Sequence, residues 1–122
     1  MYVAVGGGCW NAKSIITVNK VDLTNFKTLS AEINPGSFFP SYSLDANYGA
    51  AISLVDHNTG SNTASNNSGM KKLTSGTIGS YQIYTMDITG MVGEYYILFT
   101  SYYNCNSGGA RTYLTIDKVW LS

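Results

Sequence analysis

The chain has 122 residues, only 11% of them are charged, and the formal net charge is zero. This composition argues against a nucleic-acid-binding surface and a polybasic membrane surface, because both need clustered Lys and Arg side chains. The hydrophobic fraction of 44% argues against disorder, and no apolar run reaches the roughly 20 residues of a membrane span. We therefore expect a single domain over residues 1–122, alone or within a longer protein, with no nucleic-acid partner and no membrane insertion.

The first half of the chain predicts strands separated by turns. Residues 2–5 fit an edge strand before a run of three glycines, and residues 13–19 are rich in β-branched side chains. Residues 29–33 alternate apolar and polar side chains, which is typical of a strand with one face in water. The Asn-Pro-Gly stretch at residues 34–36 is expected to end that strand. A long packed loop then leads to a buried strand over residues 48–56.

The second half continues in the same way. Residues 57–69 consist almost entirely of Asn, Thr, Ser and Gly, so we expect an exposed loop that folding does not need. Strands are predicted over residues 71–74, 81–88, 94–103 and 111–121. No window combines helical periodicity with caps at both ends. The chain is therefore predicted to be all-β, a two-sheet antiparallel β-sandwich of about eight strands.

A short connection after residue 87 is predicted to cross from one sheet to the other. Asp87 and Thr89 have short polar side chains that can bond nearby backbone amides where a strand ends. Met91 and Val92 are apolar, which is typical of a chain that crosses a core and not of a hairpin tip in water. Gly93 must then redirect the chain into the next strand, so we expect it to have a positive φ angle.

The alternation of apolar side chains slips within the last predicted strand. Leu114 and Ile116 share one parity, whereas Val119 and Leu121 have the other. Either a β-bulge near Asp117 explains this change, or both faces of the strand are covered there.

Few residues are suited to catalysis. His57 is the only histidine, and it lies in the predicted loop, where no third group would hold it rigidly as a base. The seven acidic residues include no pair whose context indicates a shared cleft, which a glycosidase needs. Zinc would need more Cys and His ligands than the chain has. We therefore expect a protein that is not an enzyme and requires no cofactor.

The polar residues are mostly Ser, Thr, Asn and Gly, which is typical of extracellular, cell-surface and virion β proteins. Cys9 and Cys105 each lie beside a glycine-containing turn. They are compatible with one disulfide or with two buried thiols.

Residues 87–97, followed by residues 114–121, resemble the closing half of a jelly-roll carbohydrate-binding module of the galactose-binding-like type. Residues 21–29 are similar to an earlier strand of the same family. The resemblance implies jelly-roll topology and a scaffold that accompanies glycoside hydrolases, adhesins and phage tail proteins. It also implies one structural calcium ion at Asp117, although residues 1–21 lack the family's usual acidic partner.

A sugar site needs a flat apolar ring for the C–H face of the sugar and planar polar groups for its hydroxyls. For Trp10, both a binding role and a core role are open, whereas Trp120 has apolar neighbours and is assigned to the core. The candidate ligand-binding residues are Trp10, Asn11, Tyr102, Tyr103, Asn104 and Arg111.

Two functions fit these observations. The first is a non-catalytic module that binds a glycan or polysaccharide and mediates attachment or targeting. The second is a structural or decoration domain of a phage tail, fibre or surface assembly, which contacts its neighbours or other copies of itself and has no sugar ligand. Exposed rings that converge on one surface would favour the first function, and rings buried in the core would favour the second.

Overall fold

The computed structural model describes residues 2–6, 11–37, 48–56, 71–72, 76–77, 79–103 and 111–122. Side chains are described for residues 15–36, 50–56, 76–77, 79–101 and 113–122. All regular elements in these ranges are strands, and none of the described residues belongs to a helix long and apolar enough to cross a membrane. The predicted all-β class is thus confirmed. The loop expected at residues 57–69 and both cysteines lie outside the described residues.

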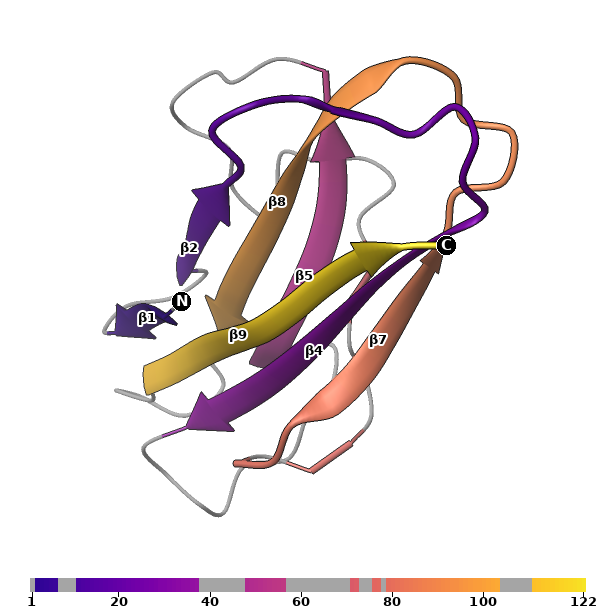
Figure 1. Cartoon of the computed structure of the whole chain (residues 1–122). Helices are drawn as coiled ribbons and strands as arrows, with labels where there is room; N and C mark the ends of the chain where they lie inside the picture. Colours follow the sequence, from indigo (N-terminus) through magenta and orange to yellow (C-terminus); the bar gives the residue numbers. More distant parts are fainter. Residues whose placement is uncertain are drawn as a thin grey trace.

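The strands form two antiparallel sheets that pack face to face (Figure 1). The first sheet has the order β1-β9-β4-β7, with β1 at Tyr2–Gly6, β9 at Arg111–Leu121, β4 at Thr28–Ser37 and β7 at Gln82–Asp87. The second has the order β2-β8-β5-β6, with β2 at Asn11–Ile16, β8 at Glu94–Tyr103, β5 at Tyr48–Val55 and β6 at Lys71–Lys72. The two-residue strand β3, at Val21–Asp22, also pairs with β8. The predicted two-sheet β-sandwich is confirmed.

The core lies between the sheets and comes from every second residue of the long strands. Leu29, Ala31 and Ile33 of β4 are buried, as their alternation predicted. They face buried side chains of the second sheet, including Ile97 and Phe99 of β8. Fully burying one Leu, Ile or Phe side chain stabilises the fold by about 1.5–3 kcal/mol.

The outer faces of the two sheets differ. In the second sheet, Leu98 and Thr100 of β8 have the opposite parity to Ile97 and Phe99, yet they are also buried. Covering both faces explains why β8 reads as a nearly unbroken apolar run. In the first sheet, Trp120 reaches the surface with an exposed fraction of 38%. Its assignment to the core is therefore wrong.

A β-bulge in β9 accounts for this orientation. Glu32 pairs with Lys118, but the next residue of β4, Ile33, pairs with Ile116, so Asp117 has no partner in β4. The bulge expected near Asp117 is confirmed. It keeps Ile116 on the core side and sets Trp120 on the outer side.

The largest differences from the sequence prediction are at the ends of two strands. β4 continues through Pro35 to Ser37 instead of ending at residue 34. Pro35 has no N–H to donate, but β7 pairs with β4 only as far as Ile33, so the ladder loses no donor there. Instead, the Pro35 carbonyl accepts a hydrogen bond from the Gly79 N–H at 2.9 Å. At the other difference, β2 ends at Ile16, and Val18 is exposed in the following turn.

The connection from β3 to β4 crosses between the sheets through a tight turn. One carboxylate oxygen of Asp22 accepts hydrogen bonds from the Thr24 backbone N–H at 2.9 Å and from its hydroxyl at 2.6 Å. The Phe26 N–H donates to the Leu23 carbonyl at 3.1 Å, which closes the turn. Leu23 itself is buried in the core. An Asp-Leu-Thr sequence therefore turns the chain and anchors it at the same time.

The connection from β7 to β8 has the same construction and crosses in the opposite direction. The Asp87 carboxylate accepts a hydrogen bond from the Thr89 N–H at 2.9 Å, and the Met91 N–H donates to the Ile88 carbonyl at 3.0 Å. Ile88 is buried, as Leu23 is in the first connection. Gly93 has a φ angle of 100°, which confirms its predicted positive value.

The two connections, which we call the arches (residues 22–27 and 87–93), bond to each other. The Leu23 N–H donates to the Gly93 carbonyl at 3.0 Å, and the Gly93 N–H donates to the Thr24 hydroxyl oxygen at 3.0 Å. The Ile88 N–H donates to the Lys27 carbonyl at 2.9 Å. The arches thus close one end of the sandwich with their own backbone and capping groups.

The apolar pair of the second arch divides between core and solvent. Met91 packs against the core, in agreement with a chain that crosses over it. Val92 is 72% exposed, so the inference from the apolar pair holds for Met91 and is wrong for Val92.

Candidate functional site

The backbone register brings two of the predicted ligand-binding residues together. β8 lies between β2 and β5, and Tyr103 at its end pairs with Asn11 on one side and Tyr48 on the other. Tyr102 pairs with Ala12 in the adjacent position. Asn11 and Tyr103 therefore occupy neighbouring strands at one level.

Arg111 lies in the facing sheet, as the first residue of β9, and pairs with Gly6 of β1. Figure 1 shows the start of β9 and the end of β8 on the side of the molecule away from the arches. Trp10 and Asn104 lie outside the described residues, as do the side chains of Asn11, Tyr102, Tyr103 and Arg111. We call these six residues the strand-end cluster, and its role in binding stays a prediction.

A second candidate site lies on the outer face of the first sheet, where side chains are described. Trp120 of β9 is opposite Ser30 of β4, and Ser30 is in turn opposite Thr85 of β7. Ser30 is small and buried, so it does not project over the indole ring. Thr85 is exposed on the far side of this row. The row thus presents an aromatic ring and a hydroxyl on an open surface.

The next row adds charge to this surface. Lys118, Glu32 and Ile83 lie across β9, β4 and β7 in register. The Lys118 Nζ lies 3.9 Å from the Glu32 Oε2 on a solvent-exposed surface, so this ion pair contributes little to stability. Both groups keep hydrogen-bonding capacity for a ligand. We call Trp120, Lys118, Glu32 and Thr85 the outer-face platform.

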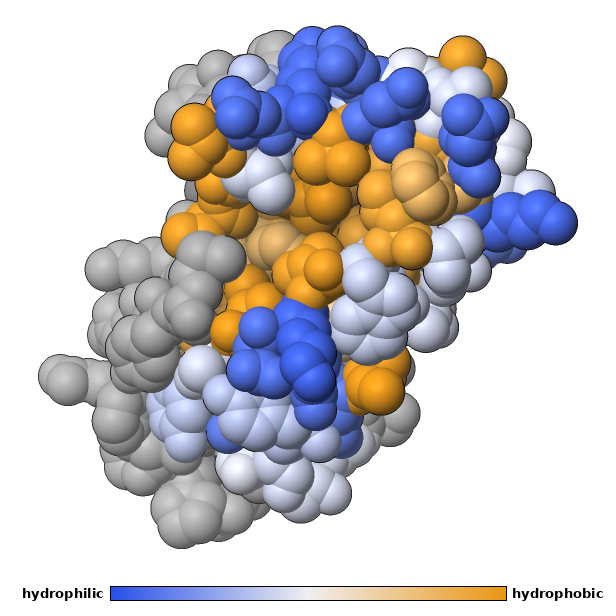
Figure 2. Space-filling model, viewed as in Figure 1, coloured by the Kyte–Doolittle hydropathy of each residue, from blue (hydrophilic) through white to orange (hydrophobic). Residues whose placement is uncertain are grey.

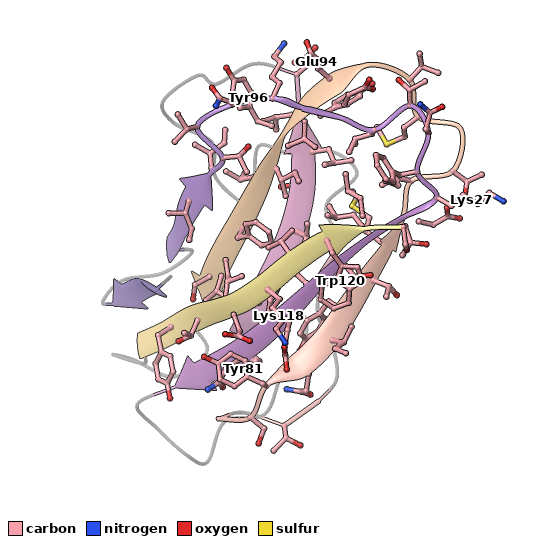
Figure 3. The ribbon with its side chains drawn as sticks, viewed as in Figure 1. Lys27, Tyr81, Glu94, Tyr96, Lys118 and Trp120 are labelled. Atoms are coloured by element: carbon pink, nitrogen blue, oxygen red, sulfur yellow. The ribbon has the colours of Figure 1, made fainter. Side chains whose placement is uncertain are left out.

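Figure 3 shows Lys118 and Trp120 close together along β9, with Tyr81 at the start of the chain segment that leads into β7. In Figure 2 the area over β9, β4 and β7 is mainly hydrophilic to neutral, with isolated hydrophobic patches. A larger hydrophobic area lies between β9 and the segment that joins β2 to β4. The platform is therefore a polar surface with an aromatic ring at its edge.

A second ring lies further along the outer face of β9. Tyr113 is opposite Gly36, and a Cβ atom at residue 36 would collide with the Tyr113 ring. The ring therefore lies against the β4 backbone, in space that only glycine leaves free. Tyr113 and Trp120 are seven positions apart, and because one of these positions is the bulge at Asp117, the distance is about 20 Å along the strand.

The described residues do not make up a calcium site around Asp117. Calcium takes six to eight oxygen ligands, and most protein sites supply several carboxylates. Asp117 is exposed at the bulge, and within the described ranges no three His, Cys, Asp or Glu side chains are grouped where they could hold a metal ion. The calcium ion implied by the family resemblance stays a prediction.

The perturbed ionisable groups have structural causes. Hydrogen bonds from Thr24 and Thr89 lower the pKa of Asp22 and Asp87, respectively, below its ordinary value. Burial raises the pKa of Tyr84 to about 12. These pKa shifts follow from turn capping and core packing. His57, the one histidine of the sequence, lies outside the described residues.

Comparison with models of protein families and with curated proteins finds no match to this chain. The functional argument therefore rests on the residues of the chain itself.

Trp120 is the residue that the sequence interpretation missed, and a signal for it was present. The change of parity around Asp117 indicated a bulge, which gives residues 119 and 121 the parity of the core side. Leu121 packs against the core, whereas Val119 is 41% exposed. Residue 120, between them, must then point outward. Judging Trp120 by the apolar character of its neighbours ignored this consequence.

Proposed function

We propose that this protein is a non-catalytic glycan-binding module of an extracellular, cell-surface or virion protein. The observation that carries the proposal is the exposure of Trp120 on the open sheet face, beside the Lys118–Glu32 pair and Thr85. The indole ring offers a flat apolar surface to the C–H face of a sugar. The ammonium, carboxylate and hydroxyl groups offer donors and acceptors to its hydroxyls.

The shape of the surface favours a chain of sugars over a single one. The platform is open, with no wall described on its outer side, so one sugar would bury little area there. Tyr113 and Trp120 are about 20 Å apart on the same face of β9, a length that spans several sugar units. We therefore propose an oligosaccharide or polysaccharide ligand that lies along β9.

The strand order supports jelly-roll topology as the finer description of the fold. Consecutive long strands alternate between the sheets, and β9 lies between β1 and β4 while β8 lies between β2 and β5. This is the arrangement that two interlocked Greek keys produce. The strand-end cluster is retained as a second proposed site for the same class of ligand, because the register brings Asn11 and Tyr103 together.

The test is a glycan array followed by calorimetry on the best ligand. Trp120→Ala is expected to weaken binding about 10- to 100-fold, because removing one stacked ring costs about 1–3 kcal/mol. Trp120→Phe keeps a smaller ring and should lose less. Tyr103→Ala tests the strand-end cluster, and Val92→Ala on the distant arch is the control.

Each result has a defined meaning. Binding that depends on Trp120 supports the platform. Binding that depends on Tyr103 and not on Trp120 moves the ligand to the strand-end cluster and overturns the platform. No binding to any glycan by a folded protein would contradict the proposed function and favour a structural domain. The edge of β7, which has no strand partner within the described ranges on the side away from β4, favours this alternative.

A further inference from the structure

β7 is the last strand of the first sheet. It pairs with β4 from Gln82 to Asp87, and no strand within the described ranges pairs with its other side. A free strand edge presents unpaired N–H and C=O groups to any chain that can extend the sheet.

The pattern of hydrogen bonds identifies which groups are free. Residues 28 and 122 bond to each other through both N–H groups, at 2.9 and 3.0 Å, so Thr28 points its backbone groups toward β9. The carbonyl of Lys27, the residue before β4, accepts the Ile88 N–H on the β7 side. Because backbone direction alternates along an antiparallel ladder, Gln82, Tyr84 and Met86 bond to β4. Ile83 and Thr85 therefore direct their N–H and C=O groups to the free edge.

The opposite side of this sheet is built differently. β1 is the edge strand there and pairs with β9 only as far as Thr115, and no strand within the described ranges pairs with β9 on that side from Asp117 onward. This stretch contains the bulge at Asp117 and the charged Lys118. Bulges and charges are features by which proteins prevent pairing at an edge.

β7 has none of these features in its interior. Its sequence Gln-Ile-Tyr-Thr-Met-Asp contains no proline, glycine or basic residue, and its only charge is Asp87 at the end. Ile83 is 63% exposed, so the edge strand carries a large apolar side chain in contact with water. β-branched and aromatic side chains also give this strand a high β-propensity.

We propose that β7 is a self-association edge, at which two copies of this chain pair antiparallel through β7. Antiparallel pairing about a two-fold axis places the same surface on both subunits, as isologous interfaces require. It also sets the two Asp87 carboxylates at opposite ends of the paired strands, so the only charges on β7 do not face each other. The two exposed Ile83 side chains come to lie near the axis, on the same outer face, and shield each other from water.

A second copy fits this edge better than an unrelated extended segment. The edge offers no basic side chain to attract an acidic segment and only one carboxylate to attract a basic one. The interior of β7 is neutral, and the β7 strand of a second copy has the same length as the edge that it would pair with. A six-residue strand buries less area than a standard stable interface, so the dimer should be weak, with a Kd between about 10 µM and 1 mM.

Pairing would join the two first sheets into one. Their outer faces would lie on the same side, which would present two outer-face platforms to one polysaccharide and raise its effective affinity. This consequence rests on the proposed function, whereas the dimer itself does not.

The first experiment is sedimentation velocity of the wild-type protein and three variants, over a concentration range that spans the expected Kd. Thr85→Pro removes an outward N–H without touching the ladder to β4, and Ile83→Lys adds the charge that protected edges carry. Both are expected to raise the Kd at least tenfold. Val92→Lys adds the same charge at an exposed apolar residue of the arch and should leave the Kd unchanged. Far-UV circular dichroism confirms that each variant is folded.

The second experiment is amide hydrogen exchange of the wild-type protein at low and high concentration. The Ile83 and Thr85 amides should be protected only at high concentration, whereas those of Gln82, Tyr84 and Met86 should be protected at both. A wild-type protein that stays monomeric throughout the range overturns the proposal. A dimer without protection at Ile83 and Thr85, or one that Ile83→Lys does not weaken, overturns it as well.

Discussion

The arches and the outer-face platform both carry polar side chains at the surface, but only the arches use them for folding. At the arches, the Asp22 and Asp87 carboxylates accept hydrogen bonds from backbone N–H groups two residues further on, and the Thr24 hydroxyl links the arches by accepting the Gly93 N–H. On the platform, Lys118 and Glu32 bond weakly to each other. Polar groups with no essential structural bond are free to bind a ligand. The comparison predicts that substitutions at the arches change stability and that substitutions on the platform change binding.

The largest expected effect concerns the buried residue of the second arch. Ile88→Ala should lower the free energy of unfolding by about 2–5 kcal/mol, because it removes a core side chain and leaves a cavity. Val92→Ala, four residues away and exposed, should change it by less than about 0.5 kcal/mol. Urea denaturation of both variants measures the difference. Equal effects would show that the arch does not anchor the chain in the core.

Gly93→Ala should destabilise the protein by about 1–2 kcal/mol. Its φ angle of 100° is a conformation that residues with a Cβ rarely adopt. No atom lies close enough to clash with the added Cβ, so the cost is purely conformational. Thermal unfolding measures it, and an unchanged melting temperature would mean that the arch relaxes without strain.

Two identical substitutions compare the regions directly. Thr24→Val removes the hydroxyl that accepts the Gly93 N–H, and it should cost about 0.5–1.5 kcal/mol. Thr85→Val removes a platform hydroxyl and should leave stability nearly unchanged, since valine suits a strand equally well. If Thr85→Val destabilises the protein as much as Thr24→Val does, the distinction between the regions fails.

The smallest effect appears only in acid. The pKa values of Asp22 and Asp87 are lowered from the ordinary value of 3.8, so each carboxylate stabilises the folded state above that pH. This contribution is lost as the pH falls through the lower pKa of the folded state. The double variant Asp22→Asn, Asp87→Asn should therefore show a weaker loss of stability below pH about 4. Melting temperatures from pH 7 down to pH 2 measure this, and a loss as steep as that of the wild type would contradict the role of these carboxylates.

The features that could be predicted from the sequence depend on neighbouring residues. The turns at Asp22 and Asp87, the positive φ angle of Gly93 and the bulge near Asp117 each follow from a few adjacent side chains. The resemblance between the two arches, Asp-Leu-Thr and Asp-Ile-Thr, was also present in the sequence. Their hydrogen bonds to each other could not be predicted, because they join residues about 70 positions apart.

The features that were missed depend on which strands are neighbours. Pro35 fits within β4 because β7 no longer pairs with β4 beyond Ile33. Trp120 is exposed because the first sheet has an open outer face, whereas residues of the second sheet such as Leu98 are buried on theirs. The pairing of Asn11 with Tyr103 is likewise a matter of register, which amino-acid types alone do not reveal.

The central claim is that the outer-face platform is the ligand-binding surface and the arches are not. Its most direct test is a heteronuclear NMR titration of the protein with the strongest glycan identified on an array. The largest shifts should occur at the Trp120 indole N–H and at the backbone amides of Lys118, Glu32 and Thr85, while those of Thr24, Thr89 and Gly93 stay unchanged. Shifts confined to the strand-end cluster or to the arches, with Trp120 unaffected, would contradict it.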